Sequence, residues 1–297
     1  MGHRSRGAAL APAAHPFGRI PLKTSFFRTH YFLPGEHGSW IWWLGPFAIG
    51  LGAAGRLQAD VLWLLAATLS GFLLRQPVMI LVKVLSRRRS RIDFRPALAW
   101  SLVYSATGFA SAVGLAAAGH GALLLLILPG ILLFGWQMWL VRKREDRGRT
   151  GTGVLGAGLL ALAAPAAYWV SGGRSSTVPW ILWVMCWLQS TASILLVYSR
   201  LEQRSWNAPA SLLARFRSAG GAWMVHFFNA VTAVTLAALG WIPWLSAAGF
   251  LLMLIDLAEG TLRPAIGARP THIGLRQLLA STVFAFLTVV GFALESM

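Results

Sequence analysis

The sequence predicts an all-α polytopic membrane protein, and three observations carry that prediction. The chain has 297 residues, of which 56% are hydrophobic, and its mean hydropathy is +0.62. Charged residues make up 12% of it, whereas soluble domains contain about 25%. These charges gather in short stretches between long apolar ones. Helices are the expected elements, because an open sheet cannot satisfy its backbone polar groups in lipid.

Nine windows of the sequence are suited to cross a bilayer as helices. Each has roughly the 20 apolar residues that span the hydrocarbon core and is bounded by charged residues or by Gly and Pro. They are 39–55, 61–82, 97–118, 122–140, 153–172, 177–198, 222–239, 240–258 and 274–294. Gly240, Pro243 and the Trp241/Trp244 pair indicate an interfacial turn between the seventh and eighth spans. Residues 34–297 are expected to form a single transmembrane helical domain.

The distribution of basic residues predicts the orientation, because Lys and Arg in short loops mark the cytoplasmic side. Of the 26 Lys and Arg residues, nearly all lie in the amino-terminal tail or in the loops after spans 2, 4, 6 and 8. The exceptions are Arg56 and Arg174 in the alternate loops and Arg75 inside the second span. We therefore expect the amino terminus inside and the carboxyl terminus outside. The net charge of +17 then describes topology and does not indicate a nucleic-acid partner.

Residues 1–33 form a basic stretch without acidic residues. No apolar stretch of signal-peptide length precedes the first span. We expect a disordered cytoplasmic tail, which can bind anionic lipid headgroups electrostatically.

Ionisable side chains at membrane depth are costly and usually face a protein interior or a water-filled cavity. Arg75 and Gln76 lie about 10 Å inward from the cytoplasmic end of the second span, at a rise of ~1.5 Å per residue. Asp256 and Glu259 lie near the cytoplasmic end of the eighth span, where Glu259 is spaced to pair with Arg263. Two compatible interpretations stay open: an ion-pair brace among Arg75, Asp256 and Glu259, or a role in binding a ligand.

Other polar side chains gather in the cytoplasmic halves of the spans or near their middle. His226 and Asn229 are one turn apart, early in the seventh span. Further examples are Ser101, Tyr104, Gln137, Gln189, Ser190, Gln277 and Ser281. Each can serve as an interhelical hydrogen bond, but together they predict a polar cavity open to the cytoplasm and closed on the outside.

The segment Pro34–Trp40 stands at the expected amino terminus of the first span. Its Glu36 and His37 are bracketed by two glycines, where free backbone N–H groups of a helix start bind anions readily. Glu36 either interacts with the helix dipole or faces the cavity together with His37. An imidazole titrates near neutrality, so His37 is also a candidate for proton transfer.

Pro34–Trp40, followed by Arg75, Gln76 and Pro77 with Lys83 and the arginine run behind them, resembles the YwiC-like family of bacterial multi-pass membrane proteins. The resemblance extends over most of the chain, including Ala164–Pro165–Ala166 and the region of Ser199 and Arg200. It implies an integral protein of the bacterial cytoplasmic membrane and leaves the activity open.

The layout is also similar to UbiA-type intramembrane prenyltransferases, which hold a prenyl diphosphate through magnesium bound by aspartate-rich motifs after spans 2 and 6. This chain has Arg75, Gln76 and Lys83 near the first position and Arg200 near the second, with no aspartate pair. Magnesium needs oxygen ligands, so transfer by that mechanism is not expected. Guanidinium groups can still bind a diphosphate or carboxylate without metal.

Three function classes remain, and no motif decides whether the chain is an enzyme. The first is a protein that binds an anionic lipid- or prenyl-type ligand in the cytoplasmic cavity. The second is a structural or assembly factor with a membrane-protein partner, and the third is a small-molecule transporter. One cysteine, Cys186, allows no internal disulfide, no Cys-based metal cluster and no CxxCH haem site. We expect no metal site and no cofactor. The candidate ligand-binding residues are Glu36, His37, Arg75, Gln76, Lys83, Arg200, His226, Asn229, Asp256 and Glu259.

Overall fold

The structure is a computed structural model that describes residues 26–35, 37–144 and 150–295. Within those ranges every regular element is helical. The α-helices are α1 (Thr29–Phe32), α2 (His37–Ala54), α3 (Val61–Leu85), α4 (Phe94–Leu115), α5 (Ile127–Lys143), α6 (Thr150–Ala161), α7 (Ala163–Val170), α8 (Val178–Gln203), α9 (Leu212–Ser218), α10 (Gly220–Ala238), α11 (Trp244–Leu262) and α12 (Pro270–Glu295). Short turns of other helix types, η1 (Arg91–Asp93), η2 (Ala116–His120) and η3 (Gly121–Leu126), complete the set.

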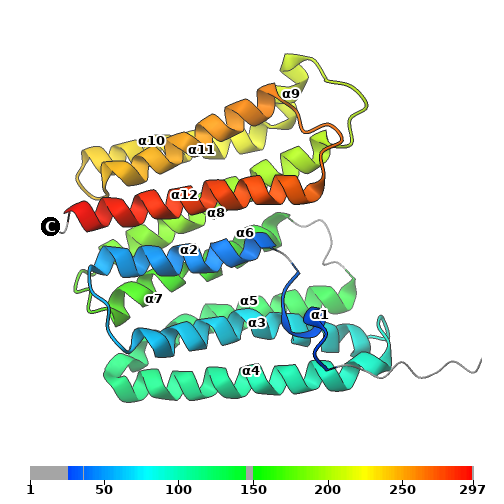
Figure 1. Cartoon of the computed structure of the whole chain (residues 1–297), viewed down its shortest axis with the longest axis vertical. Helices are drawn as coiled ribbons and strands as arrows, with labels where there is room; N and C mark the ends of the chain where they lie inside the picture. Colours follow the sequence, from blue (N-terminus) through cyan, green and yellow to red (C-terminus); the bar gives the residue numbers. More distant parts are fainter. Residues whose placement is uncertain (1–25, 36, 145–149, 296–297) are drawn as a thin grey trace, which may run out of the picture.

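The long helices lie side by side as an elongated bundle (Figure 1). At one edge α3 packs against α4 and α5, at the other α10 packs against α11, and α2, α6, α7, α8 and α12 lie between them. Consecutive long helices run in opposite directions, as short connections require.

Seven helical segments of the described residues are long and apolar enough to cross a membrane, which is typical of a multi-pass membrane protein. The number differs from the nine expected spans for two reasons. Spans 97–118 and 122–140 fall within one helical run, Arg91–Lys143, and α2 is not among the seven. That run is bent at Gly119, whose φ of +89° is a left-handed conformation that suits glycine.

Two further boundaries follow from glycine and proline. The expected spans 222–239 and 240–258 are separate helices, α10 and α11, joined through Gly240 at a φ of +72°. The expected span 153–172 is divided into α6 and α7 at Leu162, three residues before Pro165. Proline has no backbone N–H to donate, so this position suits a break in the helix.

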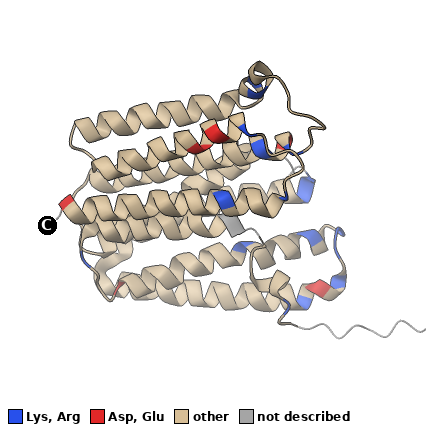
Figure 2. Cartoon of the chain, turned by 45° about the horizontal axis from the view of Figure 1, so that its top comes forward, with Lys and Arg blue, Asp and Glu red and all other residues tan. Residues whose placement is uncertain are grey.

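The basic residues gather at one end of the bundle (Figure 2). That end, here called the basic end, carries the connections 86–93, 204–211 and 263–269 together with the first turns of α4 and α10. α2 and α12 also begin there, and the described carboxyl terminus lies at the far end. Successive long helices therefore begin alternately at the basic end and at the far end, as the distribution of basic residues predicts.

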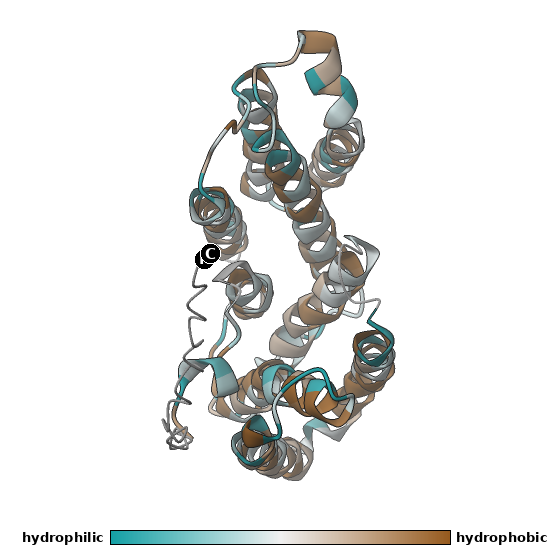
Figure 3. Cartoon of the chain, turned by 90° about the vertical axis from the view of Figure 1, so that its right-hand side faces the viewer, coloured by the Kyte–Doolittle hydropathy of each residue, from teal (hydrophilic) through white to brown (hydrophobic). Residues whose placement is uncertain are grey.

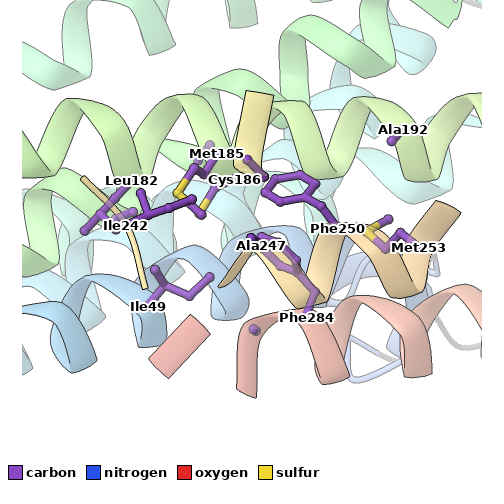
Figure 4. Packing of buried hydrophobic residues seen from close by; sticks show 14 of the residues in the cluster. Ile49, Leu182, Met185, Cys186, Ala192, Ile242, Ala247, Phe250, Met253 and Phe284 are labelled. Carbon is purple, nitrogen blue, oxygen red and sulfur yellow. The ribbon is translucent and has the colours of Figure 1, made fainter. Parts of the chain in front are cut away.

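The central core joins α2, α8, α11 and α12 through side chains that include Ile49, Leu182, Phe250 and Phe284 (Figure 4). Small residues allow close approach at its edges. Gly50 of α2 lies so near α7 that a Cβ there would overlap the backbone oxygen of Ala164. Close backbone contact of this kind is how membrane helices gain packing energy without a hydrophobic driving force between them.

Seen from the basic end, the helices carry many apolar residues (Figure 3). Large side chains of α4, α5 and α10 stand exposed, among them Phe109, Leu132 and Phe227 at 74%, 75% and 63% exposure. Apolar patches of this extent mark contact with lipid or protein, so this surface fits the bilayer that the sequence predicts.

Candidate functional site

The segment before α2 is docked against α3 and α4. Three of its backbone oxygens accept hydrogen bonds from side chains of these helices. From α4, Trp100 Nε1 donates to Phe26 O at 2.9 Å and the Tyr104 hydroxyl donates to Phe32 O at 3.0 Å. From α3, Gln76 Nε2 donates to His30 O at 2.9 Å. We call residues 26–35 the docked segment. Residues 26–33 were expected to belong to a disordered tail, whereas the structure gives them the helix α1 and fixed partners.

The docked segment extends from the basic end toward the middle of the bundle, along α3 and α4. Gln76 lies nine residues before the end of α3 and Tyr104 ten residues after the start of α4, so their depth is about 15 Å at a rise of ~1.5 Å per residue. Irregular backbone at such depth is tolerated when protein groups satisfy it. The side chains of Gln76, Trp100 and Tyr104 satisfy three of these backbone oxygens.

A second contact fixes the segment to η1, the turn that precedes α4. The Tyr31 hydroxyl donates to Asp93 Oδ1 at 2.5 Å, and Arg89 Nε donates to the other oxygen of the same carboxylate at 2.6 Å. Burial, and then the hydrogen bond to Asp93, raise the pKa of the Tyr31 phenol. Tyr31 itself is 2% exposed and packs with Ile80 and Ala97. Sequence reasoning did not identify this triad, although its arginine and aspartate have the i, i+4 spacing of an ion pair.

The first group of predicted site residues lies on α3 and at the start of α2. Arg75 is partly buried in α3, directly before Gln76, and Lys83 lies two turns further toward the basic end. Glu36 lies outside the described residues, and α2 begins at His37, whose side chain is likewise outside them. The structure therefore joins Gln76 to the docked segment and leaves the roles of Glu36 and His37 as predictions.

The second group forms an ion network between α8, α11 and α12. Arg276 Nε donates to Asp256 Oδ1 at 2.6 Å, and its terminal nitrogen also contacts Glu259. Arg200 Nη2 lies 3.4 Å from Glu259 Oε2. The expected i, i+4 contact between Arg263 and Glu259 is present at 3.8 Å.

The predicted ion-pair brace among Arg75, Asp256 and Glu259 is wrong, because Arg75 does not pair with these two acids. Arg75 belongs to α3, which packs on α1, α4, α5 and α7, whereas the two acids lie on α11, at the opposite edge of the bundle. Arg200 and Arg276 are the basic partners of these acids instead. Sequence reasoning assigned Arg276 to a loop, but its position early in the last span could have identified it as a partner at membrane depth.

Arg200 is the most enclosed member of the ion network. It is 7% exposed, and its guanidinium lies where a Cβ on Gly260 would be, 2.6 Å from Nη2. Its Nε is buried without a hydrogen-bond partner among the described residues. This position beside Glu259 suits a structural contact between α8 and α11 better than a contact with a bulky ligand.

Polar side chains at mid-bundle bond to one another. Gln189 Nε2 donates to Ser281 at 2.9 Å and to Ser193 at 3.1 Å, and Gln277 Nε2 donates to Ser193 at 2.7 Å. The void beside Gln189 and Ser281 measures about 10 Å³, which is near the lower limit for one water molecule. The predicted polar cavity is therefore absent at this position, where polar side chains of α8 and α12 pack against each other.

His226 and Asn229 are buried on α10, each at 2% exposure. Asn229 Nδ2 donates to the Leu188 oxygen of α8 at 2.9 Å, and His226 Nδ1 lies 2.8 Å from the Ala222 oxygen. α10 packs against α8, α9 and α11, whereas the docked segment contacts α3 and α4, so these two residues do not belong to the first group.

A shallow hollow of about 390 Å³ lies at the basic end beside α9, lined by Ser211, Leu213, Ala214, Arg217 and Ser218. Leu213 is 72% exposed. Exposed leucines next to arginines are typical of a segment that lies at the lipid headgroups.

Comparison with known proteins relates part of the chain to a family. The family model described as YwiC-like protein matches residues 33–168, which confirms the resemblance expected from Pro34–Trp40 and Arg75–Pro77. The match runs from the docked segment into α7 and is shorter than the resemblance expected from the sequence, so the ion network of α8, α11 and α12 lies outside it. No curated protein and no solved structure matches the chain, and the similarity to UbiA-type enzymes gains no support.

Proposed function

We propose that this YwiC-like chain crosses the bacterial cytoplasmic membrane nine times, with its basic end in the cytoplasm. The proposal adds α2 and the two arms of Arg91–Lys143 to the remaining apolar helices. Its support is the alternation of helix directions together with the gathering of Lys and Arg at one end.

Labelling of single cysteines tests this topology. The chain has one native cysteine, Cys186, which is buried, so a Cys186→Ser background leaves introduced cysteines as the reactive ones. A cysteine at Ser90 should react with impermeant maleimide only after the cytoplasmic side is opened, and one at Ser175 should react in intact cells. The reverse pattern would overturn the orientation, and equal reactivity of both in intact cells would overturn the alternation.

We further propose that the basic end binds an anionic lipid- or prenyl-type ligand beside the docked segment. One observation carries this proposal: Gln76, the neighbour of Arg75, holds the segment that leads into Pro34–Trp40. Arg75, Lys83 and the start of α2 would then border the same region. Guanidinium and helix-start N–H groups both favour phosphate or carboxylate oxygens. The apolar flanks of α3 and α4 would contact the tail.

Native mass spectrometry of the detergent-purified protein tests this function. We expect a recurrent bound lipid or prenyl species in the wild type, lost in Arg75→Lys because lysine cannot form a bidentate fork. Arg91→Lys, at an exposed arginine of the same end, is the matched control and should keep the species. If Arg75→Lys fails to fold, Lys83→Gln provides the second test and should weaken binding.

Three outcomes would overturn the lipid proposal: no bound species in the wild type, unchanged binding in both variants, or equal loss in the control. A stoichiometric protein partner in place of a lipid would instead favour the assembly factor. That alternative draws support from the interior, where polar groups bond to one another and glycines allow close packing. Transport has less support, because the mid-bundle groups that would line a path are hydrogen-bonded together.

A further inference from the structure

His226 and Asn229 of α10 form a pair with unusual hydrogen bonding. Both side chains are 2% exposed and lie one turn apart. His226 Nε2 and Asn229 Oδ1 are buried, and neither has a hydrogen-bond partner among the described residues. Buried polar atoms without partners are rare and costly, so the pair calls for a chemical explanation.

Backbone oxygens fix which atoms of the pair are acceptors. The Ala222 oxygen, 2.8 Å from His226 Nδ1, can only accept, so Nδ1 carries a hydrogen. In the neutral ring Nε2 is then an acceptor. The Leu188 oxygen likewise requires that the Asn229 atom facing it is the amide nitrogen, at 2.9 Å. The remaining Asn229 atom is therefore the carbonyl oxygen, a second acceptor.

Helix geometry places the two acceptors on one face. Residues three apart on a helix are neighbours, and side chains lean toward the helix amino terminus. His226 and Asn229 thus lie on the same face of α10. Both acceptors lack a hydrogen-bond donor among the described residues. Protonation would turn His226 Nε2 into a donor.

The charged surroundings include a carboxylate suited to balance such a proton. Asp256 lies on α11, which packs against α10, and its Oδ1 accepts a hydrogen bond from Arg276 of α12. The charged groups on the helices packed against α10 are Arg200 and Glu202 of α8, Arg215 and Arg217 of α9, and Asp256 and Glu259 of α11. Of these, Arg200 is engaged with Glu259.

We propose that His226 and Asn229 form a buried proton-binding site, in which protonated Nε2 donates to Asn229 Oδ1 and Asp256 balances the charge. The step adds one proton from solvent and breaks no covalent bond. Asp256 also holds Arg276 of α12, so proton binding would share this carboxylate between α10 and α12. The site lies outside α2–α4 and does not depend on the proposed anionic ligand.

Nitrogen NMR of histidine-labelled full-length protein in lipid nanodiscs tests the site. His226→Gln identifies the His226 signals among the seven histidines. At neutral pH we expect the tautomer with hydrogen on Nδ1, and on acidification over the range from pH 7 to about pH 5 the doubly protonated ring. In Asn229→Leu, the ratio of protonated to neutral His226 at a given pH should fall about tenfold, the expected effect of one hydrogen bond to a charged group. In Asp256→Asn the ratio should also fall, because the balancing carboxylate is removed.

Thr235→Val is the matched control, because Thr235 is an exposed residue of the same helix. It should leave the ratio unchanged. A His226 ring that stays neutral across the whole range would overturn the proposal and indicate a bridging water in its place. A hydrogen on Nε2 at neutral pH, or an equal ratio in wild type, Asn229→Leu and Asp256→Asn, would also overturn it.

Discussion

The guanidinium of Arg200 occupies the space that a side chain at position 260 would take. A Cβ on Gly260 would lie 2.6 Å from Arg200 Nη2 and 2.9 Å from Cζ. The glycine on α11 thus makes room for a buried cation from α8, one residue after Glu259, which binds that cation.

Gly260→Ala is expected to destabilise the protein by pushing Arg200 away from Glu259. Overpacking of a well-filled interior costs about 1–3 kcal/mol. Thermal unfolding in detergent measures the loss. Gly274→Ala in α12 is the control, since a Cβ there meets nothing within 4 Å, and alanine should stabilise that helix by roughly 0.5–1 kcal/mol. Equal behaviour of the two variants would refute the proposed close contact.

Arg276→Gln is expected to lower the unfolding temperature, because it leaves Asp256 without its cation and removes one partner of Glu259. The loss should be about 1–3 kcal/mol, as for hydrogen bonds to charged groups. Adding Asp256→Asn should recover much of it, because the uncompensated charge disappears. Arg263→Gln, whose side chain is 84% exposed, should change little. A double variant no more stable than Arg276→Gln would contradict the pairing.

Tyr104→Phe is expected to loosen the docked segment, because the Phe32 oxygen loses its donor. The cost should be about 1 kcal/mol. Hydrogen–deuterium exchange of residues 26–33 should become faster while the rest of the protein keeps its rate. The control is Tyr198→Phe, at a tyrosine that is 43% exposed; faster exchange of the same residues in that variant would count against a specific role of Tyr104.

Gly50→Ala is expected to be the most damaging of the glycine substitutions. Its Cβ would overlap the Ala164 oxygen and lie 2.9 Å from the Ala167 Cβ, so α2 and α7 would have to separate. Gly71→Ala of α3, where a Cβ has open space within 4 Å, is the matched control. Expression and size-exclusion profiles should show loss of folded protein for Gly50→Ala alone. Normal profiles for both would mean that α2 and α7 are less closely packed.

The helix boundaries could be predicted largely from local sequence. The turn at Gly240 and Pro243 separates α10 from α11 as expected, because glycine and proline act through their own backbone. The division of α6 from α7 was missed, since alanines surround Pro165 and the apolar window continues across it.

The partners of the charged residues could be predicted only within one helix. Glu259 and Arg263 were expected as a pair from their spacing of four, and they lie 3.8 Å apart. Arg75 was assigned to Asp256 by depth alone, but depth does not tell which helices are neighbours. Contacts between helices, such as the close approach of Gly50 to Ala164, cannot be derived from the charge pattern.

The docked segment has a consequence for how the chain is made. Its three oxygens precede their donors by 46, 74 and 72 residues, so Gln76, Trp100 and Tyr104 leave the ribosome long after the acceptors. Until α4 has been inserted, the backbone oxygens of Phe26 and Phe32 lack their donors, and an oxygen without a donor is not stable in the hydrocarbon region. The docked segment is thus synthesised before α3 and α4 but reaches its final position only after both helices are in place.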